Sequence, residues 1–227
     1  MAGRFWEAIR KLHGQFVRRS RAEVLAQHLA ELLPPEATSM LDVGCGDGLI
    51  DHEILARHPN LAIEGTDLFP RPEALIPVGA FDGLHLPYAD KSFDVVIFID
   101  VLHHAADAVF LLREAARVAR RSVLIKDHFA EGPQARVTLR FMDLIGNAGY
   151  SFAWTASYWA RGKWLQTFQE LNLSVIETRN RLGLYPAPAS WVFERSYQFV
   201  ARLDVKSQAD LIAGDRDPKY SAGTRTG

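Results

Sequence analysis

Three glycines at alternate positions, Gly44, Gly46 and Gly48, separate two short segments with different apolar patterns. Ser39–Val43 before them has the short apolar run of a buried β-strand, and Leu49–Arg57 after them has helical spacing. Glycine adopts positive φ readily and lets a backbone approach a ligand closely. The N-terminus of the following helix offers unpaired N–H groups to a negative group. The segment therefore predicts a ligand-binding loop at the carboxyl end of a strand.

Strands and helices alternate after this loop. The pattern predicts further strands over 61–66, 93–99 and 122–126, with a helix over 108–119 and two closing strands over 173–178 and 196–202. Phe93–Ile99 has no polar residue except Asp94, as expected for a strand that is buried on both faces. This alternation predicts an α/β protein with a mostly parallel sheet and helices on both faces.

The composition excludes several classes of protein. The chain has 227 residues, 26 Lys and Arg against 27 Asp and Glu, and one cysteine. One cysteine rules out an internal disulfide and a thiolate cluster, and the balanced charge gives no electrostatic case for nucleic acid. The longest apolar stretch is too short to span a bilayer, and the first residues lack the pattern of a secretory signal. We therefore expect no nucleic-acid partner, no membrane span and a cytoplasmic location.

An acidic residue follows the second predicted strand, 23 residues after Gly44. This residue, Asp67, is placed to accept the hydroxyls of a ribose. A dinucleotide loop needs G-x-G-x-x-G, but position 49 is leucine and the spacing here is G-x-G-x-G. Asp42 brings negative charge toward the loop, which suits a cationic ligand better than a pyrophosphate. S-adenosylmethionine has both a ribose for Asp67 and a positive charge that suits Asp42. The glycine spacing disfavours an NAD-dependent oxidoreductase.

These motifs resemble the class I S-adenosylmethionine-dependent methyltransferases, in particular the branch that methylates small molecules and quinone-like compounds. Leu41–Gly48 matches the first motif of that family, and the segments 81–88, 92–104 and 111–118 resemble its later motifs. The resemblance implies S-adenosylmethionine as cofactor, S-adenosylhomocysteine as product and a small-molecule acceptor. The implied cofactor-binding residues are Asp42, Gly44, Cys45, Gly46, Asp67, Leu68, Asp82, Gly83 and Asp100. Among them, Asp67 is expected at the ribose and Asp82 at the adenine amino group.

The resemblance also implies a Rossmann-like sheet of seven strands in the order 3-2-1-4-5-7-6, with the last strand antiparallel. We expect one methyltransferase domain over residues 1–205, with a helical N-terminal cap over 1–35 and a helical, aromatic insert over 132–160 that covers the acceptor. The polar residues 206–227 are expected to form a flexible tail.

Methyl transfer from a sulfonium needs no protein nucleophile, because the acceptor itself attacks the methyl carbon. A base helps only where the acceptor must lose a proton. His104 follows the strand predicted over 93–99, and His128 follows the strand predicted over 122–126, so both are expected at the site as candidate catalytic residues. Asp100, Asp127 and His128 could hold a hard cation, as in catechol-type methyltransferases. That family has an acidic–amide pair where this chain has Asp127-His128, so we expect no metal.

The aromatic residues of the predicted insert bear on the identity of the acceptor. Aromatic residues between positions 150 and 168 favour an apolar or aromatic acceptor. His13, Arg18 and Arg19 are candidates to reach the cofactor carboxylate from the N-terminal helix. Two other functions remain open: a non-catalytic cofactor-binding partner or scaffold, and an enzyme that uses the same cofactor for other chemistry. The sequence does not predict the oligomeric state.

Overall fold

The computed structural model describes residues 18–146, 156–184 and 197–206. These residues form a seven-stranded sheet in the order β3-β2-β1-β4-β5-β7-β6. The strands are β1 (Ser39–Val43), β2 (Ala62–Asp67), β3 (Val78–Ala80), β4 (Phe93–Ile99), β5 (Ala119–His128), β6 (Leu173–Arg179) and β7 (Gln198–Val205). The predicted Rossmann-like order is confirmed.

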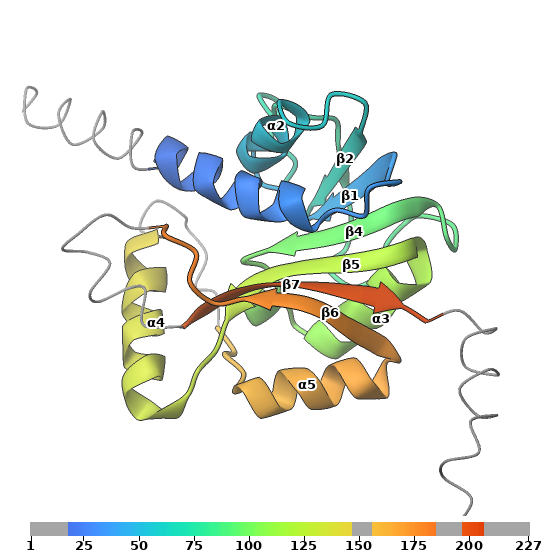
Figure 1. Cartoon of the computed structure of the whole chain (residues 1–227). Helices are drawn as coiled ribbons and strands as arrows, with labels where there is room; N and C mark the ends of the chain where they lie inside the picture. The colour runs from blue at the N-terminus through green and yellow to red at the C-terminus, as the bar shows by residue number, and fades with distance from the viewer. Residues whose placement is uncertain (1–17, 147–155, 185–196, 207–227) are drawn as a thin grey trace, which may run out of the picture.

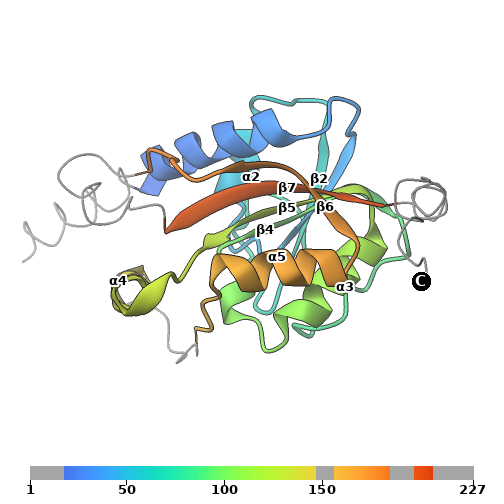
Figure 2. The same cartoon turned by 60° about the horizontal axis from the view of Figure 1, so that its bottom comes forward.

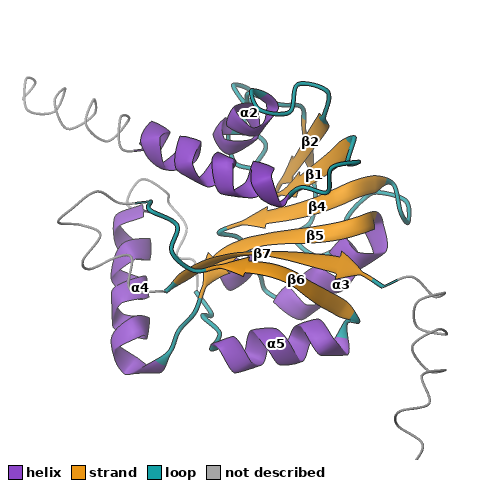
Figure 3. Cartoon of the chain, viewed as in Figure 1, coloured by secondary structure: helices purple, strands orange, loops and turns teal. Residues whose placement is uncertain are grey.

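Helices cover both faces of this sheet (Figure 1, Figure 2). The N-terminal helix, described over residues 18–32, and α2 (Leu49–Leu55) lie on one face. On the other face lie α3 (Ala108–Val118) and α5 (Arg161–Glu170). A single 3₁₀ turn, η1 (Leu102–His104), follows β4. The helix α4 (Gly132–Gly146) stands beyond the ends of β4 and β5 (Figure 3).

The strand directions explain where a site can form. The strands β3, β2, β1, β4 and β5 run parallel, so their carboxyl ends meet at one edge, the carboxyl edge. The strand β7 is antiparallel to both β5 and β6, as the family order implied. In open sheets of this kind, ligands bind outside the carboxyl ends of the strands, where the strand order reverses. Here the order reverses between β1 and β4.

Two apolar cores flank the sheet, because the central strands are buried on both faces. In β4, Val95 and Ile97 point to the core under the N-terminal helix, and Val96 and Phe98 point to the core under α3. All four side chains are fully buried. The apolar run in the sequence therefore predicted both the strand and its central place.

Four of the six predicted strands differ from the observed bounds by one to three residues at an end, and one strand, β3, was not given a predicted range. The strand β3 has three residues, Val78, Gly79 and Ala80, too few to show a hydrophobic pattern. The strand β5 extends to His128 instead of ending at Lys126. The extension continues because β7 pairs with β5 as far as His128. It carries three polar residues, Lys126, Asp127 and His128, into buried positions.

Parts of the predicted domain organisation lie outside the described residues: positions 1–17 of the cap, 147–155 of the insert and 207–227 of the tail. Within the described part, the N-terminal helix ends at residue 32, shortly before Pro34, which cannot continue a helix. No helix in the described ranges is long and apolar enough to cross a membrane.

Candidate active site

The glycine loop has the backbone that its sequence predicted. Gly44, Gly46 and Gly48 all have positive φ, at 79°, 63° and 71°. A Cβ atom at Gly44 would lie 2.5 Å from Cγ2 of Val101, so the loop packs directly on the segment after β4. A Cβ at Gly46 would meet no atom within 4 Å. Gly46 is thus open to an approaching ligand, while Gly44 fixes the loop against the sheet.

The carboxylate of Asp67 is held by two backbone N–H groups at the end of β2. Its Oδ2 accepts a hydrogen bond from Gly46 N at 3.0 Å, and its Oδ1 accepts one from Phe69 N at 2.9 Å. Each carboxylate oxygen can accept a further bond. The acid expected at a ribose is therefore tied to the glycine loop in a fixed orientation. Beside it, Leu68 is 36% exposed.

Asp82 mainly holds its own loop. Its Oδ1 accepts from the backbone N–H groups of Leu84 and His85, and its Oδ2 lies 2.9 Å from His85 Nδ1. The bond from His85 and the two backbone bonds lower the pKa of Asp82 to about 2. The side chain is 58% exposed. The next residue, Gly83, has a φ of 87°, and a Cβ there would lie 3.0 Å from Leu68.

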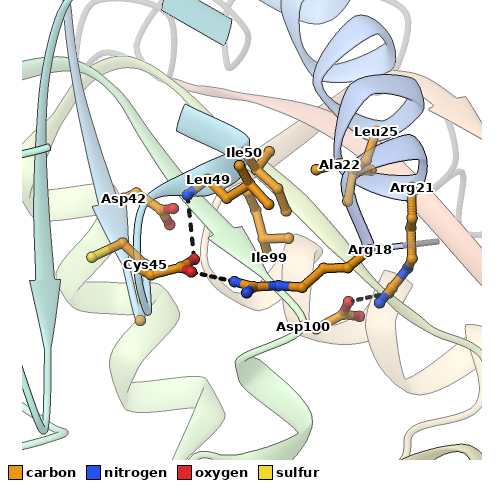
Figure 4. A pocket seen from close by; sticks show the side chains of 12 residues that line it. Arg18, Arg21, Ala22, Leu25, Asp42, Cys45, Leu49, Ile50, Ile99 and Asp100 are labelled. Atoms are coloured by element: carbon orange, nitrogen blue, oxygen red, sulfur yellow. Dashed lines mark hydrogen bonds and ion pairs between the residues drawn. The ribbon is translucent and has the colours of Figure 1, made fainter. Parts of the chain in front are cut away.

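A pocket of about 160 Å³ lies between the glycine loop and the N-terminal helix (Figure 4). Of the predicted cofactor residues, it brings together Asp42, Gly44, Cys45 and Asp100, whereas Asp67, Leu68, Asp82 and Gly83 do not line it. The helix contributes Arg18 and Arg21 to its wall, along with Ala22 and Leu25. Arg18 pairs with Asp47 of the loop, and Arg21 pairs with Asp100 at 2.9 Å.

Two buried carboxyl groups lie beside each other next to this pocket, which is lined by Asp42 but not by Asp51. Asp42, at the end of β1, is 2% exposed, and Asp51, in the first turn of α2, is 1% exposed. Among the described residues, Oδ1 of Asp42 and both carboxyl oxygens of Asp51 have no hydrogen-bond donor. Burial, and after it the charge of Asp51, raise the pKa of Asp42 well above its usual range. Burial raises the pKa of Asp51 as well.

Cys45 contributes its backbone to the loop. Its thiol lies against Gly65, where a Cβ would collide with the sulfur. Burial, followed by the nearby carboxyl groups of Asp42 and Asp51, raises the pKa of the thiol. The thiol is therefore a poor nucleophile.

Asp100 joins the pocket to the ends of β4 and β5. It has a φ of 59°, in the left-handed region that a residue with a side chain seldom adopts. Its Oδ1 pairs with the fully buried ammonium of Lys126, and its Oδ2 accepts from Arg21. Burial alone would raise the pKa of Asp100, but Lys126, then His128 and Arg21, hold it below its usual range. Asp100 is therefore an ionised carboxylate between two cations.

Next to this group, His103 and Asp127 form a buried hydrogen-bonded pair. Nδ1 of His103 lies 2.7 Å from Oδ1 of Asp127, and the side chains are 3% and 0% exposed. Burial would raise the pKa of Asp127, yet His103 and then His128 keep it below its usual range. An ionised carboxylate only accepts hydrogen bonds, so the proton of the pair belongs on Nδ1 and the lone pair of the ring on Nε2.

The two histidines named from the sequence flank this pair. The ring of His104 lies 4.1 Å from that of His103, between centroids, and His104 is partly exposed. Nδ1 of His128 lies 3.4 Å from Asp127 and 3.6 Å from Asp100. Burial, and then Lys126, lower the pKa of His128, so its imidazole is neutral at pH 7.

His103 was not named among the candidate catalytic residues predicted from the sequence, and its pairing with Asp127 was missed. The signal was present, because both His103 and Asp127 follow strands that end at the same edge. Their pairing across 24 residues became visible only in the structure. Asp51 and Lys126 were missed for the same reason, since each acts through a buried partner from another element.

Two aromatic residues from the insert and α5 pack on the histidine cluster. Tyr158 stacks on His103 with centroids 5.1 Å apart, and its hydroxyl donates to the carbonyl of Leu139 in α4. Nε1 of Trp164 donates to the carbonyl of His128 at 3.1 Å. Of the aromatic residues considered for the acceptor, Tyr150, Phe152 and Trp154 lie outside the described residues.

Asp100, His103 and His128 offer ligand atoms within 4.8 Å of one another. Lys126 and Arg21 already pair with the carboxylate of Asp100. A divalent ion there would sit beside two fixed positive charges, which costs free energy. These surroundings disfavour a cation.

Comparison with known proteins shows which proteins this chain is similar to. Residues 41–125 match the family model described as "Methyltransferase domain". The chain is 32% identical over 111 residues to a 27-O-demethylrifamycin SV methyltransferase from Amycolatopsis mediterranei, covering 42% of this chain and 40% of that protein. It is 34% identical over 104 residues to a demethylmenaquinone methyltransferase from Roseiflexus, covering 42% and 44%. The chain thus matches less than half the length of these relatives.

Solved structures agree on the fold. A putative methyltransferase in complex with the Haloferax volcanii activator Trm112 superposes with a TM-score of 0.64 at 16% identity, over 86% of this chain and 96% of that one. The [4+2]-cyclase SpnF superposes with a TM-score of 0.60 at 15% identity, over 81% of each chain. Sheet order and site define a Rossmann-like protein with a ligand pocket at its topological switch point. Residues 41–125 are thus similar to the methyltransferase domain of that family, and the described chain shares its fold with the solved structures.

Proposed function

We propose that this protein transfers a methyl group from S-adenosylmethionine to a small aromatic or apolar acceptor that carries an ionisable O–H group. The observation that carries the proposal is the meeting of two features at Asp100. Asp100 lines the pocket beside the glycine loop, and His128 and the His103–Asp127 pair adjoin it at the ends of β4 and β5. The first feature suits a nucleoside with an amino-acid tail, and the second suits a proton acceptor.

The residues present fit this cofactor. The orphaned oxygen of buried Asp42 calls for a donor or a cation, and the open backbone at Gly46 leaves room for a ligand. Asp67, fixed by two N–H groups, would hold the ribose, with Leu68 beside the adenine. Asp82 and Gly83 would line the adenine site. The rest of the cofactor would be surrounded by Asp42, Gly44, Cys45 and Asp100. When bound, S-adenosylmethionine supplies an electrophilic methyl group.

The role of the chain is then to align the acceptor and to take its proton. His103, its Nδ1 committed to Asp127, would accept a proton from the acceptor O–H at Nε2. The resulting imidazolium would be stabilised by the carboxylate of Asp127. Neutral His128 and partly exposed His104 complete the polar wall of this space. A positioned base of this kind contributes about 10²- to 10⁴-fold to a rate.

Tyr158 restricts which acceptors reach His103. Its ring covers the imidazole, and its hydroxyl is tied to α4. An acceptor that approaches Nε2 must share the space next to this ring. A flat aromatic compound is better suited to that space than a bulky aliphatic one, and offers an O–H acidic enough for a histidine base.

The test has two arms on the full chain. Calorimetric titration with S-adenosylmethionine, S-adenosylhomocysteine and NAD⁺ measures cofactor choice. Mass spectrometry then follows formation of S-adenosylhomocysteine with a panel of phenols, hydroquinones, primary amines and aliphatic alcohols. We expect micromolar binding of the first two ligands only, and turnover confined to phenols and hydroquinones.

Each other outcome has a defined meaning. Binding of NAD⁺ alone would contradict the cofactor assignment. Tight binding of S-adenosylmethionine without consumption across the panel would favour a scaffold or a non-methylating enzyme. Turnover of amines but not of phenols would contradict the O–H acceptor while leaving methyl transfer intact.

A further inference from the structure

The pair Asp42–Asp51 places two acidic groups side by side in a buried position, which is costly when both are ionised. Both side chains are buried, and the described residues supply no donor to three of their four oxygens. Two ionised carboxylates in contact repel each other strongly in a dry environment. One shared proton removes the repulsion and gives each group a hydrogen-bond partner.

The pocket above this pair contains charges of both signs. From the N-terminal helix come Arg18 and Arg21, and from the sheet edge come Asp42, Asp47 and Asp100 (Figure 4). An α-amino acid group carries one ammonium and one carboxylate on the same carbon. A wall of guanidinium groups opposite a floor of carboxyl groups is complementary to such a zwitterion.

We propose that Asp42 and Asp51 share one proton in the ligand-free protein, and that the α-ammonium group of the cofactor displaces this proton when it binds. The inference rests on the proposed cofactor. The exchange balances in charge: the ligand brings one positive charge, the pair becomes doubly ionised, and one proton passes to the solvent. Asp51 is then a positioning residue, because it acts on the ligand through the charge of Asp42.

Other charged groups around the pair set the direction of this exchange. The acids nearby raise its proton affinity, and the two arginines lower it. These groups are Asp67 from β2, Asp47 and the Cys45 thiol from the loop, Asp100 after β4, and Arg18 and Arg21 from the N-terminal helix. Arg18 and Arg21 are each paired with an acid, which leaves the buried pair in a net negative surrounding. Burial and these acids raise the pKa of the pair, which favours its protonated form.

The experiment counts protons. Titration of the full chain with S-adenosylmethionine in phosphate and in imidazole, whose ionisation enthalpies differ, gives the number released per ligand at each pH between 6 and 7, where the ligand's own α-amino group, with a pKa of about 7.8, stays mostly charged. We expect up to one proton released per ligand, and a dissociation constant that falls by up to tenfold per pH unit in the same window. S-adenosylhomocysteine has the same ammonium group and should release the same number. Methylthioadenosine, which lacks the amino-acid group, should bind without release.

Matched variants locate the proton. Asp51→Asn keeps the size of the side chain and removes one titrating group, so we expect its release to vanish and its affinity to become independent of pH. Asp90→Asn is the control, because Asp90 is 75% exposed, pairs with Arg117 and does not line the pocket, so its proton release should equal that of the unaltered chain. If Asp51→Asn does not fold, the three ligands on the unaltered chain still decide the matter.

Three results would overturn the inference while leaving the cofactor in place. They are binding of S-adenosylmethionine without proton release, equal release by methylthioadenosine, and release by S-adenosylmethionine but not by S-adenosylhomocysteine. Failure of all three ligands to bind would instead contradict the proposed function itself. The two failures are therefore distinguishable in one set of titrations.

Discussion

The two halves of the carboxyl edge are built in different ways. The half at β1 and β2 relies on backbone: glycines with positive φ, and a carboxylate held by two N–H groups. The half at β4 and β5 relies on buried side chains that pair across the sheet, namely His103 with Asp127 and Lys126 with Asp100. Backbone geometry can bind a common ligand with little sequence, whereas a paired side-chain cluster can be changed residue by residue. The comparison suggests that the first half is generic and the second half specific to the reaction.

The largest effect should come from breaking the pair in the β4–β5 half. We expect Asp127→Asn to lower turnover about 10³-fold, because an amide no longer fixes the tautomer of His103 or stabilises its charged form. Affinity for S-adenosylmethionine should stay within about threefold, since Asp127 does not line the cofactor pocket. The measurement is the rate of S-adenosylhomocysteine formation with the fastest acceptor of the panel.

His104→Ala is the matched comparison, since the sequence named His104 as the candidate base. Its rate should fall less than that of Asp127→Asn. A larger loss of rate in His104→Ala than in Asp127→Asn would indicate that the partly exposed His104, and not His103 of the buried pair, acts as the base.

The next effect concerns stability. Lys126→Met leaves the carboxylate of Asp100 without its buried cation, and we expect the free energy of unfolding to fall by about 3 kcal/mol. Urea denaturation measures it. Arg18→Gln removes a cation that is 57% exposed from Asp47, and exposed pairs are worth about 0.5 kcal/mol. Equal losses of unfolding free energy in Lys126→Met and Arg18→Gln would show that buried ion pairs do not stabilise the β4–β5 half more than exposed pairs stabilise the β1–β2 half.

A third effect tests the β1–β2 half. Asp67→Ala should weaken S-adenosylmethionine binding by more than about tenfold, because the ribose hydroxyls and the N–H of Gly46 lose their acceptor. Asp82→Ala should change the affinity by less than about threefold, since its carboxylate is already used by its own loop. Calorimetric titration compares them. A reversed order would make adenine recognition, not ribose recognition, the main polar contact.

The smallest effect is a dependence of stability on pH. The raised pKa values of Asp42 and Asp51 mean that the folded chain binds protons more tightly than the unfolded one. Their contribution is therefore complete at low pH and is lost as the pH rises through the folded-state pKa values. Between pH 5 and pH 8 the free energy of unfolding should fall in both proteins. We expect the fall to be about 1 kcal/mol smaller in Asp51→Asn than in the unaltered chain. Parallel slopes in urea denaturation would rule out this linkage.

The sequence predicted the β1–β2 half well, because its signals are local. Gly44 to Gly48 and Asp67 lie within 24 positions of one another, and their roles follow from residue type and order. The central strand β4 was equally clear from its unbroken apolar run.

The β4–β5 half was predicted only in part. His128 was placed at the right edge, but the partners His103 and Asp127 are 24 positions apart, and Arg21 and Asp100 are 79 apart. Such pairs depend on strand register and on how far β5 extends, which the pairing with β7 decides. The three-residue strand β3 is too short to leave a pattern at all.

The antiparallel course of β7 has a practical consequence for handling the protein. The strand starts at Gln198, opposite His128, and ends beyond Asp204, opposite Ser122. The chain therefore leaves the sheet at the edge opposite the pocket (Figure 1). A tag or a surface linkage attached after position 206 would therefore join the described part of the chain at that opposite edge. Immobilised protein held by that end should keep the cofactor affinity it has in solution, which makes sensor-based screening of acceptors practicable.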